Sequence, residues 1–186
     1  MTTRGRTTRA TATPCAVVTV SDRCSRGEET DLSGPILRRA LGALGYRADL
    51  GGVVPDDLGE IYKAVRDVLR LGARVVITSG GTGIGPRDVT PEAVASFITT
   101  PLPSMEQLYT QESLRQTHFA ALSRGRIGLT ATTPRALIIS LPGSAKAAEL
   151  AVDVLFPLFQ HALEQMGQEG ILRGKYTDHG GPANGQ

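Results

Sequence analysis

Hydrophobic residues follow two alternating patterns along the chain. Short, β-branched apolar runs are separated by longer segments in which apolar side chains recur every three or four residues, the spacing of one helix face. The strand over residues 46–54 contains Gly51 and Gly52, which weaken it. In total, the short runs predict strands over residues 15–21, 46–54, 74–79, 126–132 and 135–141.

The longer segments predict helices that begin near residues 33, 57 and 90, and two more over 105–117 and 145–166. Gly45 and Gly72 are expected to end the first two helices, because glycine accepts the left-handed conformation common at helix C-termini. Thr90 is expected to be the N-cap of the third helix. Pro157 is expected to kink or split the last one.

This alternation predicts a single α/β domain with a mostly parallel sheet and helices on both faces. Ligands of such sheets bind beyond the carboxyl ends of the strands. If the strands are parallel, the loops at those ends gather at one edge, and we expect a binding site there. Four predicted strand ends run into polar loops: Ser21–Asp22, Pro55–Asp56, Ser79–Asp88 and Leu141–Ser144.

The glycine loop between Thr78 and Glu92 is the strongest candidate for chemistry. It has four glycines within six residues and lies between a strand and a helix start, an arrangement typical of anion sites. Arg87 and Asp88 add both charge signs. No Gly-Lys-Ser/Thr follows, and Pro86 stands at the third glycine position of a dinucleotide fingerprint, so neither motif is present. A purely structural turn is the alternative.

Composition narrows the classes of function. The 186 residues, 40% apolar and 20% charged, fit one globular domain over 14–170, with a disordered arm over 1–13 and a flexible tail over 171–186. A net charge of +2 without basic runs argues against nucleic-acid binding. Cys15 and Cys24 form neither a disulfide framework nor a zinc motif. Because no membrane span or secretory signal is visible, we expect a cytoplasmic protein.

The four loops contain carboxylates and no histidine. A serine or cysteine nucleophile would therefore lack its usual base. Carboxylates with loop amides suit Mg²⁺ and phosphates, with the nucleophile supplied by a substrate. Asp57 is better explained as a helix cap, and for Asp31 a cap and a functional role are both open. Asp56 and Asp88 are the candidates for function.

The sequence Ser79-Gly-Gly-Thr-Gly-Ile-Gly-Pro-Arg-Asp-Val-Thr-Pro-Glu-Ala93 resembles the signature of the molybdopterin adenylyltransferase family, the MogA/MoaB-like proteins of molybdenum cofactor biosynthesis. The resemblance extends over about residues 17–166. The signature also occurs in molybdenum insertases and competence-damage-type proteins, but a short chain without further domains favours the stand-alone type. Further segments follow in the family's order: Val20–Arg23, Asp31–Gly34, Val54–Asp56 and Leu141–Ser144.

The resemblance implies a three-layer α/β/α sandwich, usually a homotrimer and sometimes a hexamer. It also implies Mg²⁺-dependent transfer of AMP from ATP to the terminal phosphate of molybdopterin, with release of pyrophosphate. Asp56 and Asp88 would be the catalytic carboxylates and the Mg²⁺ ligands, Arg87 or Lys146 would offset phosphate charge, and a molybdenum insertase would be the partner that receives the product. Residues implied to bind the substrates are Ser21, Asp22, Ser79, Gly80, Gly81, Thr82, Gly83, Pro142, Gly143 and Ser144.

One stretch departs from the family pattern. Between Leu102 and Tyr109, this chain differs at positions where the family usually has a glycine and an arginine. The departure keeps a second function open, that of a non-catalytic molybdopterin- or molybdenum-binding protein on the same domain. A nicotinamide-dependent oxidoreductase would need a phosphate fingerprint and a ribose-binding acid, and the sequence has neither.

Overall fold

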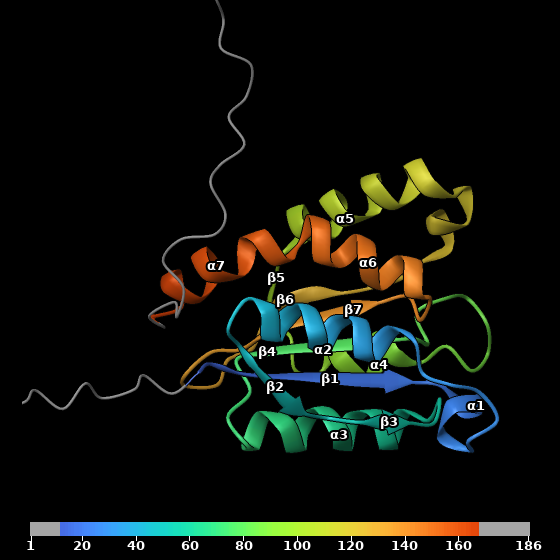
Figure 1. Cartoon of the computed structure of the whole chain (residues 1–186), viewed down its shortest axis with the longest axis horizontal. Helices are drawn as coiled ribbons and strands as arrows, with labels where there is room; N and C mark the ends of the chain where they lie inside the picture. The colour runs from blue at the N-terminus through green and yellow to red at the C-terminus, as the bar shows by residue number, and fades with distance from the viewer. Residues whose placement is uncertain (1–11, 168–186) are drawn as a thin grey trace, which may run out of the picture.

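The computed structural model describes residues 12–167, which form a seven-stranded sheet with helices on both faces (Figure 1). The tail expected over 171–186 and most of the arm expected over 1–13 lie outside the described residues. Thr13 is buried, and its carbonyl accepts a hydrogen bond from the Arg47 backbone N–H at 3.0 Å. The fold therefore includes the last residue of the expected arm.

The sheet is mostly parallel, as predicted. Its order is β2-β1-β4-β7-β6-β5, and β3 pairs with β1 beyond the end of β2. The pairs among β1, β2, β3, β4 and β7 are parallel, whereas β6 is antiparallel to both β5 and β7. The strands are β1 (Pro14–Val20), β2 (Arg47–Leu50), β3 (Val53–Val54), β4 (Val75–Ser79), β5 (Thr100–Pro101), β6 (Ile127–Leu129) and β7 (Leu137–Leu141).

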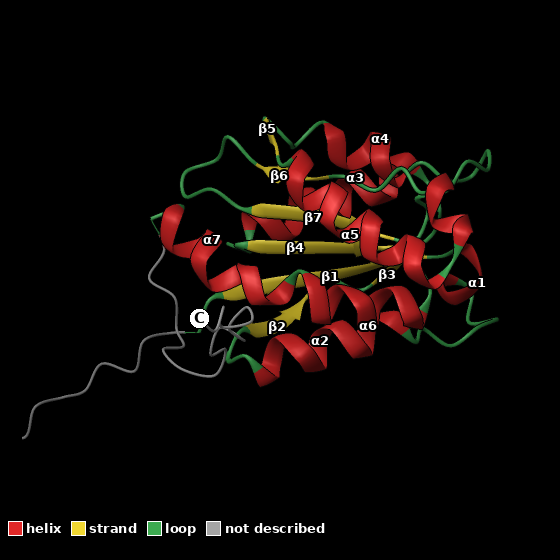
Figure 2. Cartoon of the chain, turned by 90° about the horizontal axis from the view of Figure 1, so that it is seen from above, coloured by secondary structure: helices red, strands yellow, loops and turns green. Residues whose placement is uncertain are grey.

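The helices form one layer on each side of the sheet. α2, α5, α6 and α7 cover one face, seen from above in Figure 2, and α3 with α4 covers the other. The helices are α1 (Asp22–Ser25), α2 (Ser33–Ala43), α3 (Leu58–Arg70), α4 (Thr90–Ala95), α5 (Pro103–Gln116), α6 (Ala145–Val154) and α7 (Phe159–Gln165). Two short 3₁₀ helices, η1 (His118–Leu122) and η2 (Phe156–Leu158), complete the set. The expected three-layer α/β/α architecture is confirmed.

Alternating side chains of the central strands supply the two cores. In β1, Cys15 and Val17 pack with α2 and α6, whereas Ala16 packs with α3 and Val18 with residues of α3 and α4. All four side chains are fully buried. Burial on both faces is typical of a central parallel strand, which explains why these strands are continuous apolar runs.

Three local predictions can be compared with the structure, and their outcomes differ. The strand expected over 46–54 is two short strands, because Gly51 has a φ of +89° and lies so close to β1 that a Cβ would be 2.3 Å from the Val17 carbonyl oxygen. Thr90 as an N-cap is wrong: Val89 occupies that position, and Thr90 is buried within the first turn. The split at Pro157 is confirmed, since η2 separates α6 from α7.

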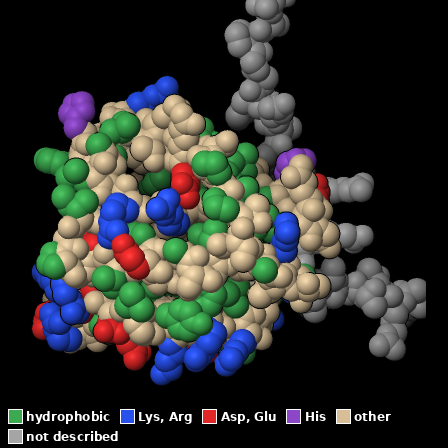
Figure 3. Space-filling view, turned by 180° about the vertical axis from the view of Figure 1, so that it is seen from behind, with side chains coloured by type: hydrophobic (Ala, Val, Ile, Leu, Met, Phe, Trp, Pro, Cys, Tyr) green, Lys and Arg blue, Asp and Glu red, His purple; other side chains and the backbone are tan. Residues whose placement is uncertain are grey.

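The surface matches the small net charge of +2. On the face seen in Figure 3, acidic side chains lie among the basic ones, except along the lower edge, where several basic side chains lie side by side. Within residues 12–167, no helix is both long and apolar enough to cross a membrane.

Candidate functional site

The four polar loops converge at one edge of the sheet, as predicted. The Gly80 backbone N–H donates to the Leu141 carbonyl at 2.9 Å, and the Ser21 N–H donates to the Val54 carbonyl at 2.9 Å. A Cβ placed on Gly143 would lie 3.1 Å from the Gly80 Cα, so the glycine loop and the loop after β7 touch. The close approach of their backbones requires residues without side chains.

Steric contacts explain two of the glycines in the loop after β4. Gly80 has a φ of +116°, and a Cβ there would lie 2.0 Å from the Val20 carbonyl oxygen. The Asp88 carboxylate occupies the space beside Gly83, where a Cβ would be 2.8 Å from its Oδ2. This same oxygen accepts a hydrogen bond from the Gly85 N–H at 2.8 Å. The loop therefore folds around the Asp88 carboxylate.

Two cavities flank the contact between the glycine loop and the loop after β7. The larger, with a volume of about 750 Å³, contains Asp88 and Thr82 in its lining. The smaller, of about 370 Å³, contains Asp56. Both are lined by Gly81, Gly143 and Ser144, which we call the ridge. Each cavity thus has one of the two carboxylates that the sequence selected, and the ridge separates them.

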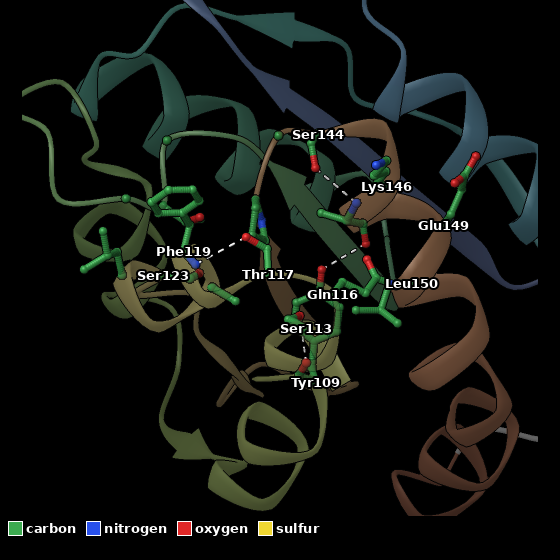
Figure 4. Close-up of a pocket in the computed structure, with 18 of the residues that line it drawn as sticks. Tyr109, Ser113, Gln116, Thr117, Phe119, Ser123, Ser144, Lys146, Glu149 and Leu150 are labelled. Carbon is green, nitrogen blue, oxygen red and sulfur yellow. Dashed lines mark hydrogen bonds between the residues drawn. The ribbon is translucent and has the colours of Figure 1, made fainter. Parts of the chain in front are cut away.

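The large cavity lies between α6 on one side and α5 with η1 on the other (Figure 4). The Tyr109 hydroxyl donates to the Ala147 carbonyl in the first turn of α6 at 2.9 Å, which holds the two walls together. Burial raises the pKa of Tyr109 to about 12, so it remains a neutral donor. Phe119, with 81% of its surface exposed, lies at the mouth, and Lys146 lines the α6 side.

This second wall was not predicted from the sequence. The sequence predicted a helix over 105–117 and a departure from the family pattern at Leu102–Tyr109 near the site, but not that α5 and η1 form one wall of a cavity. In the structure, Tyr109 is the only buried residue of α5, and together with Ser113 and Gln116 it lines the cavity. No pattern in the sequence of this helix indicates that role.

Several polar groups beside the small cavity already make hydrogen bonds within the fold. Asp31 accepts from the Gly34 N–H at 2.9 Å and from the Thr19 hydroxyl at 2.7 Å, so its carboxylate organises the start of α2. Ser21 caps α1 by accepting from the Cys24 N–H at 3.2 Å. For Asp31 these contacts favour the structural role. Asp57 is likewise the N-cap of α3, as expected.

Asp22 and Arg87 form an ion pair beside the small cavity rather than in its lining. Two guanidinium nitrogens of Arg87 bind the Asp22 carboxylate, at distances from 2.8 to 3.2 Å. Desolvation by itself raises the pKa of Asp22, but the hydrogen bonds from Arg87 and from the Asp56 backbone outweigh it and hold the pKa below its usual value. In this arrangement Asp22 is already neutralised by a cation of the protein.

Two serines that were expected to bind the substrates differ in how their hydroxyls are used. Ser79 is buried, and its hydroxyl contacts the Ser33 hydroxyl at 2.9 Å and the Pro142 carbonyl at 3.3 Å. Ser144 is the N-cap of α6 and accepts from the Ala147 N–H at 3.1 Å while remaining exposed on the ridge. Ser79 thus links neighbouring loops through its side chain, and Ser144 is available to a ligand.

The carboxylates suit a magnesium ion that arrives with phosphates. Within residues 12–167, no group of three or more His, Cys, Asp or Glu side chains is arranged to hold a metal. Asp56 and Asp88 line different cavities. Mg²⁺ is commonly held by one or two carboxylates together with substrate phosphates and water, so this donor set fits that mode and not an all-protein cage.

Backbone amides, exposed hydroxyls and two carboxylates around a ridge at the carboxyl edge of a parallel sheet are typical of α/β proteins that bind phosphate-bearing ligands. A comparison with known families identifies the group. Residues 16–161 match the family described as "Probable molybdopterin binding domain", and the chain belongs to that family.

Relatives and solved structures agree with this membership. The chain is 40% identical over 158 residues to the molybdenum cofactor synthesis protein cinnamon of Drosophila melanogaster, covering 84% of this chain and 26% of that protein. It is 34% identical over 154 residues to a molybdopterin adenylyltransferase of Pyrococcus furiosus, covering 80% of this chain and 90% of that one. The crystal structure of MoaB, a tungsten cofactor synthesizing protein from the same organism, superposes with a TM-score of 0.78 at 30% identity, over 84% of this chain and 98% of that one.

Several relatives are much longer than the matched region. The chain spans about a quarter of the Drosophila protein and about half of two bacterial relatives named as bifunctional molybdenum cofactor biosynthesis proteins. In those proteins, a domain similar to this chain is joined to further sequence.

Proposed function

We propose that this protein acts in molybdenum cofactor biosynthesis as a molybdopterin adenylyltransferase. It transfers AMP from ATP to the terminal phosphate of molybdopterin and releases pyrophosphate. The observation that carries the proposal is the pair of cavities that share Gly81, Gly143 and Ser144. A reaction between two phosphate-bearing substrates needs two binding volumes that meet where phosphate is bound.

The similarity to the Pyrococcus furiosus adenylyltransferase supports this choice over other activities in the family, because the match covers 90% of that protein. The alternative of a non-catalytic molybdopterin- or molybdenum-binding protein shares the fold and the family. Such a protein would bind its ligand without releasing pyrophosphate.

The chemistry needs no nucleophile from the protein. An oxygen of the molybdopterin phosphate attacks the α-phosphorus of ATP, and the bond from this phosphorus to the oxygen bridging the α- and β-phosphates breaks as pyrophosphate leaves. Since the two substrates repel each other, the protein must hold them in line and stabilise the charge that develops at the α-phosphate. The ridge amides and the Ser144 hydroxyl supply donors at the point where the two cavities meet.

Asp56 and Asp88 are the residues that would hold Mg²⁺, each from its own cavity. When bound, Mg²⁺ offsets the negative charge of the phosphates. Lys146 lines the large cavity and adds a positive charge on the α6 side. Arg87 is paired with Asp22, so it would reach a phosphate only after leaving that carboxylate.

We further propose the oligomeric state that the resemblance implies, a homotrimer or a hexamer. We also propose a cytoplasmic location, which was expected from the sequence and not from the resemblance. Relatives of about twice the matched length are named bifunctional, which supports transfer of the adenylated product to a second protein, a molybdenum insertase.

An assay of pyrophosphate release tests the proposal. The full chain is incubated with ATP, Mg²⁺ and molybdopterin, and each component is omitted in turn. We expect pyrophosphate only when all three are present. Binding of molybdopterin without pyrophosphate in the complete mixture would favour the non-catalytic alternative.

A further inference from the structure

We propose that Arg124 is a positioning residue that fixes the glycine loop from Thr82 to Asp88 in the conformation used for catalysis. The inference rests on the proposed function, because it concerns the loop of that same site. Arg124 lies between η1 and β6 and is about 40 residues from the loop in sequence.

Arg124 binds the loop at three backbone carbonyls. Its own backbone N–H donates to the Thr82 carbonyl at 2.8 Å. Its Nε donates to the Gly83 carbonyl at 2.7 Å, and its Nη2 donates to the Asp88 carbonyl at 2.6 Å. The Arg124 side chain therefore connects the Gly83 and Asp88 ends of the glycine-rich segment, in addition to the hydrogen bond that the Gly85 N–H donates to the Asp88 carboxylate.

Glu92 orients the Arg124 guanidinium. The remaining nitrogen, Nη1, contacts the Glu92 carboxylate, and this pairing holds the pKa of Glu92 below its usual value. Glu92 lies in the first turn of α4, the helix that follows the loop. Loop, helix start and Arg124 thus form one unit, in which the planar guanidinium matches several acceptors at fixed angles.

Arg124 acts from outside the two substrate cavities. It lines a third cavity of about 620 Å³ together with Arg126, Glu92 and residues of α5, and it is absent from the linings of the other two. It therefore has no direct contact with a ligand on the ridge. Its effect is transmitted through the carbonyls of Gly83 and Asp88, which set where the Asp88 carboxylate and the loop amides point.

The main test replaces Arg124 with alanine in the full chain. Because a displacement of about 1 Å in a reacting group costs about 100-fold, we expect kcat to fall by about that factor. The dissociation constant for ATP should change far less, by less than about fivefold on the same reasoning. Added guanidinium ion can enter the third cavity and should restore part of kcat. Arg124→Lys keeps the charge but loses the planar fork, and we expect an intermediate kcat.

A control variant separates the loop contacts from charge. Arg126→Ala removes the same charge from the same cavity and leaves the bonds from Arg124 to the loop in place. It should retain kcat within about threefold, well below the tenfold that 1.4 kcal/mol represents. Glu92→Gln removes the ion pair that orients Arg124 but leaves the bonds to the carbonyls, so kcat should fall less than in Arg124→Ala.

Amide hydrogen exchange of residues 82–88, measured without substrates, tests the inference independently of activity. Exchange should be faster in Arg124→Ala than in the unchanged protein and slower again with guanidinium.

If the unchanged protein forms no pyrophosphate, the proposed function fails while this measurement still decides the role of Arg124. Unchanged loop exchange, or a kcat that guanidinium does not restore, would overturn the inference. If the alanine variant does not fold, the Arg124→Lys variant carries the same comparison.

Discussion

Asp22 and Asp56 bind each other's backbone. The Asp22 N–H donates to Asp56 Oδ2 at 2.7 Å, and the Asp56 N–H donates to Asp22 Oδ1 at 3.1 Å. The pair joins the loop after β1 to the loop after β3, which are 34 residues apart. Each carboxylate therefore has a backbone partner on one oxygen. Both oxygens of Asp22 also bind Arg87, whereas the other oxygen of Asp56 faces Gly81 of the ridge, 3.1 Å from where a Cβ would lie.

The Asp22 carboxylate should titrate below its usual range because of Arg87. Replacing Arg87 with glutamine should raise the pKa of Asp22 toward the ordinary value of about 3.9. Since the folded-state pKa is lowered, the pair contributes stability above the unfolded-state pKa and loses it as the pH falls through the folded-state pKa. Carboxyl NMR titration measures the shift, and urea unfolding below about pH 4 should depend less on pH in the variant.

Arg47→Gln is the matched control, since it removes another surface pair, with Asp49, far from the site in sequence. It should leave the pKa of Asp22 unchanged. An Asp22 pKa that is the same in Arg87→Gln as in the unchanged protein would show that Arg87 does not hold it.

Asp88→Asn should lower AMP transfer by at least about tenfold, or 1.4 kcal/mol. Asparagine retains an oxygen that accepts the Gly85 N–H, so the loop should keep its shape while losing the charge. Tm should move by less than about 2–4 °C, the change that about 1 kcal/mol produces in a chain of this size. Asp57→Asn is the control, because asparagine caps a helix as well as aspartate does. Retained transfer within about threefold would remove Asp88 from the proposed magnesium set.

Gly80→Ala should destabilise the fold by about 2 kcal/mol or more, through its positive φ and the clash with Val20. Gly42→Ala provides the opposite case in the same chain. Gly42 lies in α2 with open space at its Cβ position, so alanine should stabilise by about 0.5–1 kcal/mol. Urea unfolding measures both, and equal effects of the two substitutions would contradict the described loop geometry.

The two thiols should react at very different rates. Burial raises the pKa of the Cys15 thiol to about 12, and Cys15 has no exposed surface, whereas Cys24 lines the small cavity and is partly exposed. Because the thiolate is the reactive form, a disulfide reagent at about pH 8 should modify one thiol in the folded protein and two after unfolding.

The Cys24→Ser variant should lose the fast reaction. A ligand in the small cavity should slow it, so ATP with Mg²⁺ and molybdopterin are each tested as protecting agents. Protection by neither would argue that the small cavity takes no substrate.

The sequence was sufficient to predict those parts of the structure that local signals determine. Apolar runs such as Val75–Ile77 predicted buried strands, Pro157 predicted the break between α6 and α7, and parallel strands required the polar loops to meet. Contacts between distant segments could not be predicted from the sequence. Neither the binding of the loop by Arg124 nor the hydrogen bond from Tyr109 to Ala147 has a local signal, because each joins residues 36 or more positions apart.

Thr90 shows how tertiary structure overrides a local preference. A threonine before proline and glutamate is a reasonable N-cap. In the structure, its backbone N–H donates to the Gly81 carbonyl at 3.0 Å, which draws Thr90 into the first turn under the loop. The glycine loop therefore sets the start of α4.

The fate of the α-phosphate of ATP distinguishes adenylyl transfer from binding alone. The full chain is incubated with Mg²⁺, molybdopterin and ATP labelled at the α-phosphate, and the pterin product is isolated. The proposed reaction predicts label on the pterin, pyrophosphate in equal amount, and little of either with Asp88→Asn. Molybdopterin bound by the protein while all label stays in ATP would contradict adenylyl transfer.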